Sequence, residues 1–172
     1  MEGGAVELAA LKIINYITIG GKMNTCFEVA NYFLKRQEPE AGDLMTNLKL
    51  QKLVYYAQGF YLAMMDSPLF NEPIEAWEHG PVCVPLYHEY KNFGSNPIPV
   101  PVDVDAYSIF NEKTHEVLDM VHKYYGQFSA WKLRNLTHAD TPWITAYNNG
   151  RAEITHKSMM DYFKTQLVDE ET

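Results

Sequence analysis

The sequence predicts a mainly α-helical fold, a compact single-domain helical bundle with one or two short extended segments. Three observations predict this fold. Apolar residues recur at helical spacing, each such stretch begins with a residue type that caps helix N-termini, and prolines or glycines end it. Hydrophobic residues make up 47% of the 172 residues and aromatic residues 13%, which is enough for a packed core and excludes a disordered chain.

The first predicted helix begins after Thr25. Thr25 and Glu28 form the capping-box pattern, in which the hydroxyl and the carboxylate each accept a hydrogen bond from a free backbone N–H group. Apolar residues follow at helical spacing up to Leu34. Residues 37–43 contain a proline, a glycine and three carboxylates, so we expect an exposed loop there.

The strongest helical pattern begins at Thr46, which can cap the helix, and ends before Pro68, which cannot continue the hydrogen-bond ladder. Its apolar row consists of Leu50, Leu53, Val54, Ala57, Phe60, Tyr61 and Met64. Such a row predicts a central element of the core. The helical period places other side chains on the remaining faces, namely Lys49, Lys52, Tyr55 and Gln58.

A short extended segment is predicted next. Residues 74–77 alternate between apolar and polar side chains, which predicts a strand, and Gly80-Pro81 then turns the chain. Pro85 suits the first turn of a following helix, because a proline lacks only an N–H group that would be free there anyway. Gly94 is a fitting end for that helix.

The C-terminal half is predicted to be extended first and helical afterwards. Residues 96–101 hold three prolines and should be extended. Further helix starts are predicted at Asn111, Ser129, Thr141-Pro142, and Thr155 or Ser158. Ile154 is expected in a brief strand before the last helix.

One domain is predicted over residues 23–168, because the chain shows no internal repeat and no linker. Residues 1–22 are expected to be a leader outside it, with a short N-terminal helix as the alternative, and residues 169–172 an acidic tail. No run approaches the roughly 20 apolar residues of a membrane span. The two cysteines, Cys26 and Cys83, form no CxxC pair, and a soluble, cytoplasmic protein is expected.

The charge balance argues against nucleic acid as a partner. The formal net charge is −8, whereas nucleic-acid binders present a basic face that displaces counterions from phosphate. An acidic chain is better suited to a protein partner that carries basic groups.

The residues predict no catalytic site and no metal site. Zinc ligands usually share one helical face at close spacing, and none of the six histidines completes such a set. Cys83 lies four residues after His79, and a base near a thiol can activate it. Its neighbours Val82, Val84 and Pro85 are more typical of a buried, inert thiol.

Three blocks of the sequence resemble a known family. Residues 46–59, TNLKLQKLVYYAQG, are similar to the signature helix of the Panacea domain. Residues 74–82 and 84–90 look like the family's second block, and residues 136–143 like its third. The resemblance covers roughly residues 23–168 with the blocks in order. Its structural signature is expected to comprise Leu50, Leu53, Trp77, Gly80, Pro81, Tyr87, Pro142 and Trp143.

The resemblance implies a mostly helical fold and a role as the antitoxin of a two-gene toxin–antitoxin system. The family includes SocA-like antitoxins and phage-associated GepA-type proteins, and many members are encoded in prophages. They commonly neutralise unrelated toxins by direct protein binding, and one member is an adaptor that delivers its toxin to a protease. The expected partners are therefore a cognate protein toxin and, for an adaptor, an intracellular protease. Neither a cofactor nor enzymatic activity is expected.

We expect the core around the central helix to act as scaffold and more exposed residues to contact the partner. The candidates are Lys49, Gln51, Lys52, Tyr55, His79 and His138. Two alternatives stay open. One is a prophage enzyme, a hydrolase or a metal-dependent protein that uses Cys83 or the histidines. The other is a DNA-binding autoregulator, against which the acidic charge argues.

Overall fold

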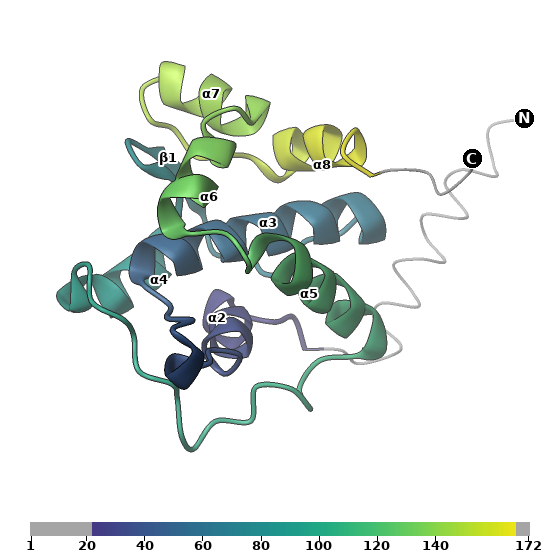
Figure 1. Cartoon of the computed structure of the whole chain (residues 1–172). Coiled ribbons are helices and arrows are strands. Elements are labelled where there is room, and N and C mark those ends of the chain that lie inside the picture. The colour runs from purple at the N-terminus through teal and green to yellow at the C-terminus, as the bar shows by residue number, and fades with distance from the viewer. Residues whose placement is uncertain (1–21, 168–172) are drawn as a thin grey trace, which may run out of the picture.

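The computed structural model describes residues 22–167, in which helices predominate and one small sheet is formed (Figure 1). The mainly α-helical class is thereby confirmed. The predicted leader, apart from Lys22, and the predicted acidic tail lie outside the described residues. In chain order the elements are α2 (Cys26–Leu34), the 3₁₀ helix η1 (Pro39–Ala41), α3 (Asn47–Met65), β1 (Ile74–Trp77), β2 (Gly80–Cys83), α4 (Val84–Tyr90), the 3₁₀ helix η2 (Lys91–Phe93), α5 (Glu112–Tyr125), α6 (Ala130–Thr137), α7 (Thr141–Asn148) and α8 (His156–Lys164).

Helix α3 runs through the centre of the molecule, as predicted (Figure 1). The helices α2, α4, α5, α6 and α8 and the strand β2 all pack against it. Every residue from Leu50 to Ala63 is therefore buried, including those that the helical period places away from the apolar row. Met64, which was predicted in that row, is 41% exposed because it lies in the last turn.

Side-chain caps begin most of the helices. Thr25 and Glu28 form the predicted capping box at α2, with the Thr25 N–H donating to Glu28 Oε2 at 2.8 Å. The predicted caps Thr46 of α3 and Ser129 of α6 are also confirmed. The predicted helix starts at Asn111 and, of the two alternatives, Thr155 prove to be the caps of α5 and α8. These local signals hold because each cap satisfies a backbone donor that has no partner inside its own helix.

Strands β1 and β2 form an antiparallel hairpin, of which only the first strand was predicted. Trp77 pairs with Gly80, so Glu78 and His79 make the turn. The prediction that Gly80-Pro81 turns the chain is therefore wrong, because both residues belong to β2. The predicted extended segment at Ile154 runs beside β1, and its N–H group donates to the Ile74 carbonyl at 2.7 Å.

An aromatic cluster joins α3 to α5 and α8. The Tyr56 ring stacks on Tyr125 with centroids 3.9 Å apart, and Phe60 meets Phe163 edge-on at 4.8 Å. Gly59 makes this approach possible, because a Cβ atom at that position would lie 2.1 Å from Cε2 of Phe163. Such close packing of large rings is the main source of stability that the fold offers at this end.

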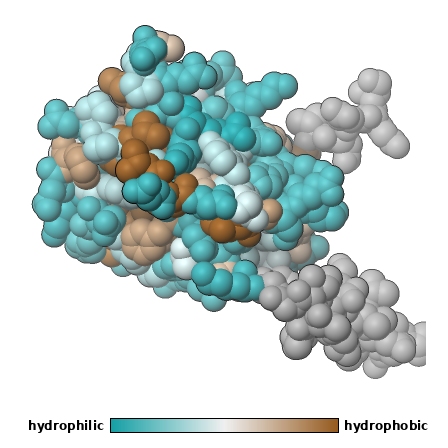
Figure 2. All heavy atoms as spheres, turned by 90° about the horizontal axis from the view of Figure 1, so that it is seen from below, coloured by the Kyte–Doolittle hydropathy of each residue, from teal (hydrophilic) through white to brown (hydrophobic). Residues whose placement is uncertain are grey.

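Apolar side chains gather on the underside of the molecule, which the segment between η2 and α5 crosses (Figures 1 and 2). The exposed apolar residues of this segment are Val102, Val104, Tyr107 and Ile109. Within the described part of the chain, no helix combines the length and apolar character needed to cross a membrane.

Candidate functional site

Four of the six predicted partner contacts are buried. We expected Lys49, Gln51, Lys52 and Tyr55 at exposed positions, and this expectation is wrong because neighbouring elements cover α3 on all sides. His79 is exposed in the hairpin turn, and His138 is half-buried at the end of α6.

Gln51 and Lys52 attach the hairpin to α3. The Gln51 Oε1 atom accepts a hydrogen bond from the Cys83 N–H at 2.8 Å. Lys52 Nζ donates to the Pro81 carbonyl at 2.9 Å. Both bonds satisfy backbone groups of β2 that no third strand of the described residues reaches. The polar side chains of α3 thus position the hairpin.

Gly80 is required where the hairpin crosses α3. Its φ angle of +98° lies in the region that favours glycine. A Cβ atom there would lie 2.6 Å from Thr137 Oγ1 and 2.8 Å from Lys52 Cε. Any larger residue would push β2 away from both α3 and α6, which explains the glycine of the predicted signature.

Burial, and to a smaller extent the charge of the nearby Arg134 guanidinium, lowers the pKa of Lys52 to about 7. The side chain is fully buried, so its charged form loses hydration. Among residues 22–167 its amine has one hydrogen-bond partner, the Pro81 carbonyl, although an ammonium group has three donors. The structure thus places an incompletely satisfied amine beneath the hairpin.

A pocket of about 380 Å³ opens beside this amine, between the start of α3, the hairpin and the end of α4. We call it the hairpin pocket. Its lining comprises Asn47, Leu48, Gln51, Lys52, Trp77, Glu78, His79, Val82, Tyr87, Lys91, Gly94 and Arg151. It brings together three of the six predicted contacts, Gln51, Lys52 and His79, and two signature aromatics. Lys91 and Arg151 were missed, because both lie far in sequence from the α3 residues with which they share the pocket.

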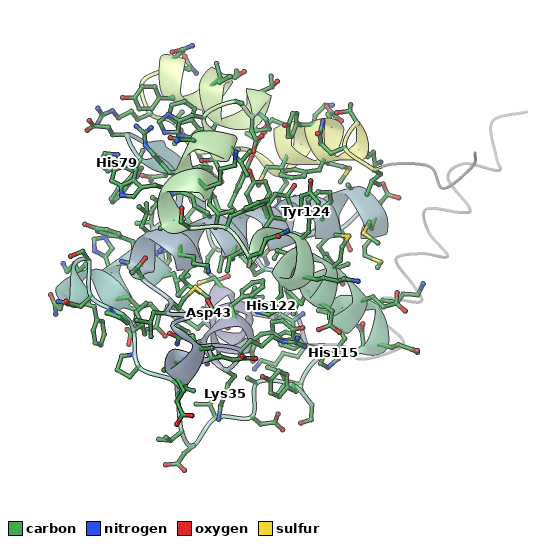
Figure 3. The ribbon with its side chains drawn as sticks, in the orientation of Figure 1. Lys35, Asp43, His79, His115, His122 and Tyr124 are labelled. Carbon is green, nitrogen blue, oxygen red and sulfur yellow. The ribbon has the colours of Figure 1, made fainter. Side chains whose placement is uncertain are left out.

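The outer edge of the hairpin pocket continues onto α6. The His79 ring, on the outer side of the hairpin in Figure 3, meets the Trp131 ring edge-on at 5.8 Å. Trp131 is 60% exposed, and the Arg134 guanidinium lies 5.6 Å from its ring centroid. Tryptophan and arginine are enriched among the residues that contribute most to binding at protein interfaces.

The sixth candidate, His138, packs between elements of the fold. Its ring stacks on Trp143 at 4.0 Å, and the Trp143 indole N–H donates to the Trp77 carbonyl at 2.9 Å. Burial and the charge of Arg134 lower the pKa of His138. The stack therefore ties α6 and α7 to the first strand, and His138 lies behind the hairpin rather than in the hairpin pocket.

Lys49 and Tyr55 lie away from the hairpin pocket. Lys49 Nζ donates to the Gly126 carbonyl at 2.7 Å and pairs with Asp43 at 3.3 Å, on the side of the molecule where Figure 3 shows Asp43 and His122. Tyr55 packs against Phe163, and burial raises the pKa of its hydroxyl well above the usual value. Both side chains hold neighbouring elements on α3.

The two cysteines are buried together beneath the hairpin. The pKa of the Cys26 thiol is raised, most strongly by its hydrogen bond with Cys83 and next by its burial. Cys83 is only 1% exposed, whereas His79 lies out in the turn. This burial argues against Cys83 as the nucleophile that the enzyme alternative requires. Within residues 22–167 no group of three or more His, Cys, Asp or Glu side chains is arranged to hold a metal ion.

Comparison with known proteins gives a consistent result. The family model described as "Antitoxin SocA-like, Panacea domain" matches residues 50–144, which include the hairpin and, from α3, the pocket residues Gln51 and Lys52. Antitoxin SocA from Caulobacter vibrioides (strain NA1000 / CB15N) is 30% identical over 140 residues, which cover 72% of this chain and 74% of that protein. No solved structure matches the chain.

Proposed function

Because the chain belongs to the SocA-like Panacea-domain antitoxin family, we propose that it is an antitoxin that neutralises a cognate protein toxin by direct binding. The family membership carries this proposal. The site supports it, because the hairpin and α6 present exposed aromatic and basic side chains beside a pocket. A domain that works in this way inhibits by covering a surface of its partner.

The genome neighbourhood provides the test. The gene beside the one that encodes this chain is expressed alone and together with it, and bacterial growth is measured. We expect the neighbouring product to stop growth alone, the pair to grow, and the two proteins to copurify. Rescue without a complex would contradict direct binding, and absence of toxicity would contradict the antitoxin assignment.

A proteolytic adaptor is the finer form of this proposal. An adaptor would shorten the half-life of the toxin, whereas a stoichiometric inhibitor would leave it unchanged or lengthen it. The two modes are separated by stopping translation and following the half-life of tagged toxin with and without the antitoxin.

A further inference from the structure

The hairpin pocket is basic although the chain is acidic. Three basic side chains, Lys52, Lys91 and Arg151, line it together with one carboxylate, that of Glu78. The whole chain has a formal net charge of −8. A local reversal of charge of this kind attracts an anionic group and repels a cationic one.

The three basic side chains have no carboxylate partner within residues 22–167. All five ion pairs in this part of the chain involve other basic residues. Within the described chain Arg151 donates to the Tyr147 hydroxyl alone, at 3.3 Å, and Lys52 to the Pro81 carbonyl alone. The buried Lys52 amine has unused donors, and an anionic group bound beside it would favour its charged form.

The same pocket offers apolar contacts beside the charges. Trp77 and Tyr87 meet edge-on at 4.8 Å in its wall, and Trp131 continues the surface beyond His79. A bound group that carries a carboxylate next to an apolar side chain would match both features. Arginine and lysine pair well with carboxylates, and the aromatic rings can cover aliphatic or aromatic neighbours.

We propose that the hairpin pocket binds an Asp or Glu side chain on an acidic, partly apolar segment of the toxin. The inference rests on the proposed function, which supplies the toxin, and adds the site and the chemistry of recognition. A protein segment fits better than nucleic acid. Nucleic-acid binding relies on many phosphate contacts, whereas this basic area is one small pocket with Glu78 at its edge on an acidic chain.

The test uses the purified toxin encoded by the neighbouring gene and a double variant, Lys91→Glu/Arg151→Glu. Both side chains are exposed, so the fold should be retained, which a thermal melt checks. The matched control is Lys113→Glu/Lys123→Glu, which makes the same change in net charge on exposed positions of α5. Figure 1 places α4 and α5 on opposite sides of the view.

We expect the pocket variant to weaken toxin binding by about tenfold or more and the α5 control to leave it nearly unchanged. At about 0.5 M salt the difference between wild type and pocket variant should shrink, because screening weakens exposed charge pairs. Toxin mutants selected for rescue by the pocket variant should carry Asp or Glu changed to Lys or Arg.

Equal toxin binding by wild type and pocket variant would overturn the inference and leave the proposed function standing. Failure of the wild type to bind the toxin would overturn both. If the pocket variant lost binding to DNA of its own promoter and kept full affinity for the toxin, the pocket would be a nucleic-acid site instead.

Discussion

The two halves of helix α3 are built differently, although every residue from Leu50 to Ala63 is buried. The C-terminal half packs aromatic rings against α5 and α8, with Gly59 allowing the closest approach. The N-terminal half buries Gln51 and Lys52 against the hairpin and α6. Apolar burial stabilises a fold directly, whereas burial of an amine costs free energy unless the amine is fully bonded.

The difference suggests a division of roles along one helix. The aromatic end contributes most of the stability, and the polar end positions the hairpin and its pocket. Substitutions at the aromatic end should therefore lower the free energy of unfolding strongly. Substitutions in the pocket should change binding and the dependence of stability on pH.

The largest expected effect is that of Phe163→Ala. The ring is buried against Tyr55, Tyr56 and Phe60, so its removal leaves a cavity. We expect the free energy of unfolding to fall by about 3–5 kcal/mol in urea denaturation. Met64→Ala is the control, because this exposed side chain should contribute within about 0.5 kcal/mol. Similar losses for both variants would contradict the assignment of the core.

Gly59→Ala should destabilise by about 1–3 kcal/mol, because the added methyl group would lie 2.1 Å from the Phe163 ring. This loss outweighs the gain of about 1 kcal/mol that alanine brings inside a helix. In the Phe163→Ala background the methyl group has room, so the same substitution should become neutral or stabilising. Additive losses in the double variant would show that the two positions are not in contact.

Lys52→Met should change how stability depends on pH. The folded-state pKa of Lys52 is about 7 against an ordinary value of 10.5, so between these values the unfolded chain binds a proton that the folded chain lacks. Wild-type stability should therefore rise with pH in this window, by up to about 1.4 kcal/mol per pH unit, relative to the methionine variant. Below pH about 7 both states are protonated, and the difference should be flat.

Urea denaturation of both proteins between pH 6 and 9 measures how the difference in their free energies of unfolding depends on pH. Arg134 of α6, His138 directly after α6, and Glu78 and His79 of the hairpin turn, which line the same pocket as Lys52, are present in both proteins. Their own titration therefore cancels to first order. Parallel pH profiles would show that Lys52 is not held in a depressed state.

The smallest expected effect is that of Thr46→Ala, which removes the cap of α3. The Thr46 hydroxyl accepts a hydrogen bond from the Lys49 N–H at 3.2 Å. Its loss should lower the free energy of unfolding by about 1 kcal/mol, and Thr46→Ser should restore most of it. A serine variant as unstable as the alanine variant would point to the methyl group of the threonine rather than to the cap.

The helices could be predicted from the sequence because their signals are local. Caps such as Thr25 and Thr46 act within one turn of their own helix, and the apolar row of α3 marks a helix by its spacing. The second strand was missed because Gly80 and Pro81 are typical of turns. Here a tertiary contact overrides that preference, since only glycine fits between Lys52 and Thr137.

The burial of Lys49 and Lys52 could not be predicted in this way. Helical periodicity separates faces of a helix, but the number of elements that pack around it depends on the whole fold. The hairpin pocket could not be predicted from the sequence for the same reason. Lys91 and Arg151 line the pocket together with residues of α3 that are distant in sequence, and no spacing in the sequence relates them.

Titration of the purified toxin with this protein tests the central claim, neutralisation by occupation of the partner, most directly. Calorimetry and residual toxin activity are followed in the same titration. We expect one saturable complex, with toxin activity lost in proportion to the fraction bound and toxin mass unchanged. Loss of activity at a small fraction of one equivalent, with a covalent change in the mass of the toxin, would identify an enzyme and rule out neutralisation by binding.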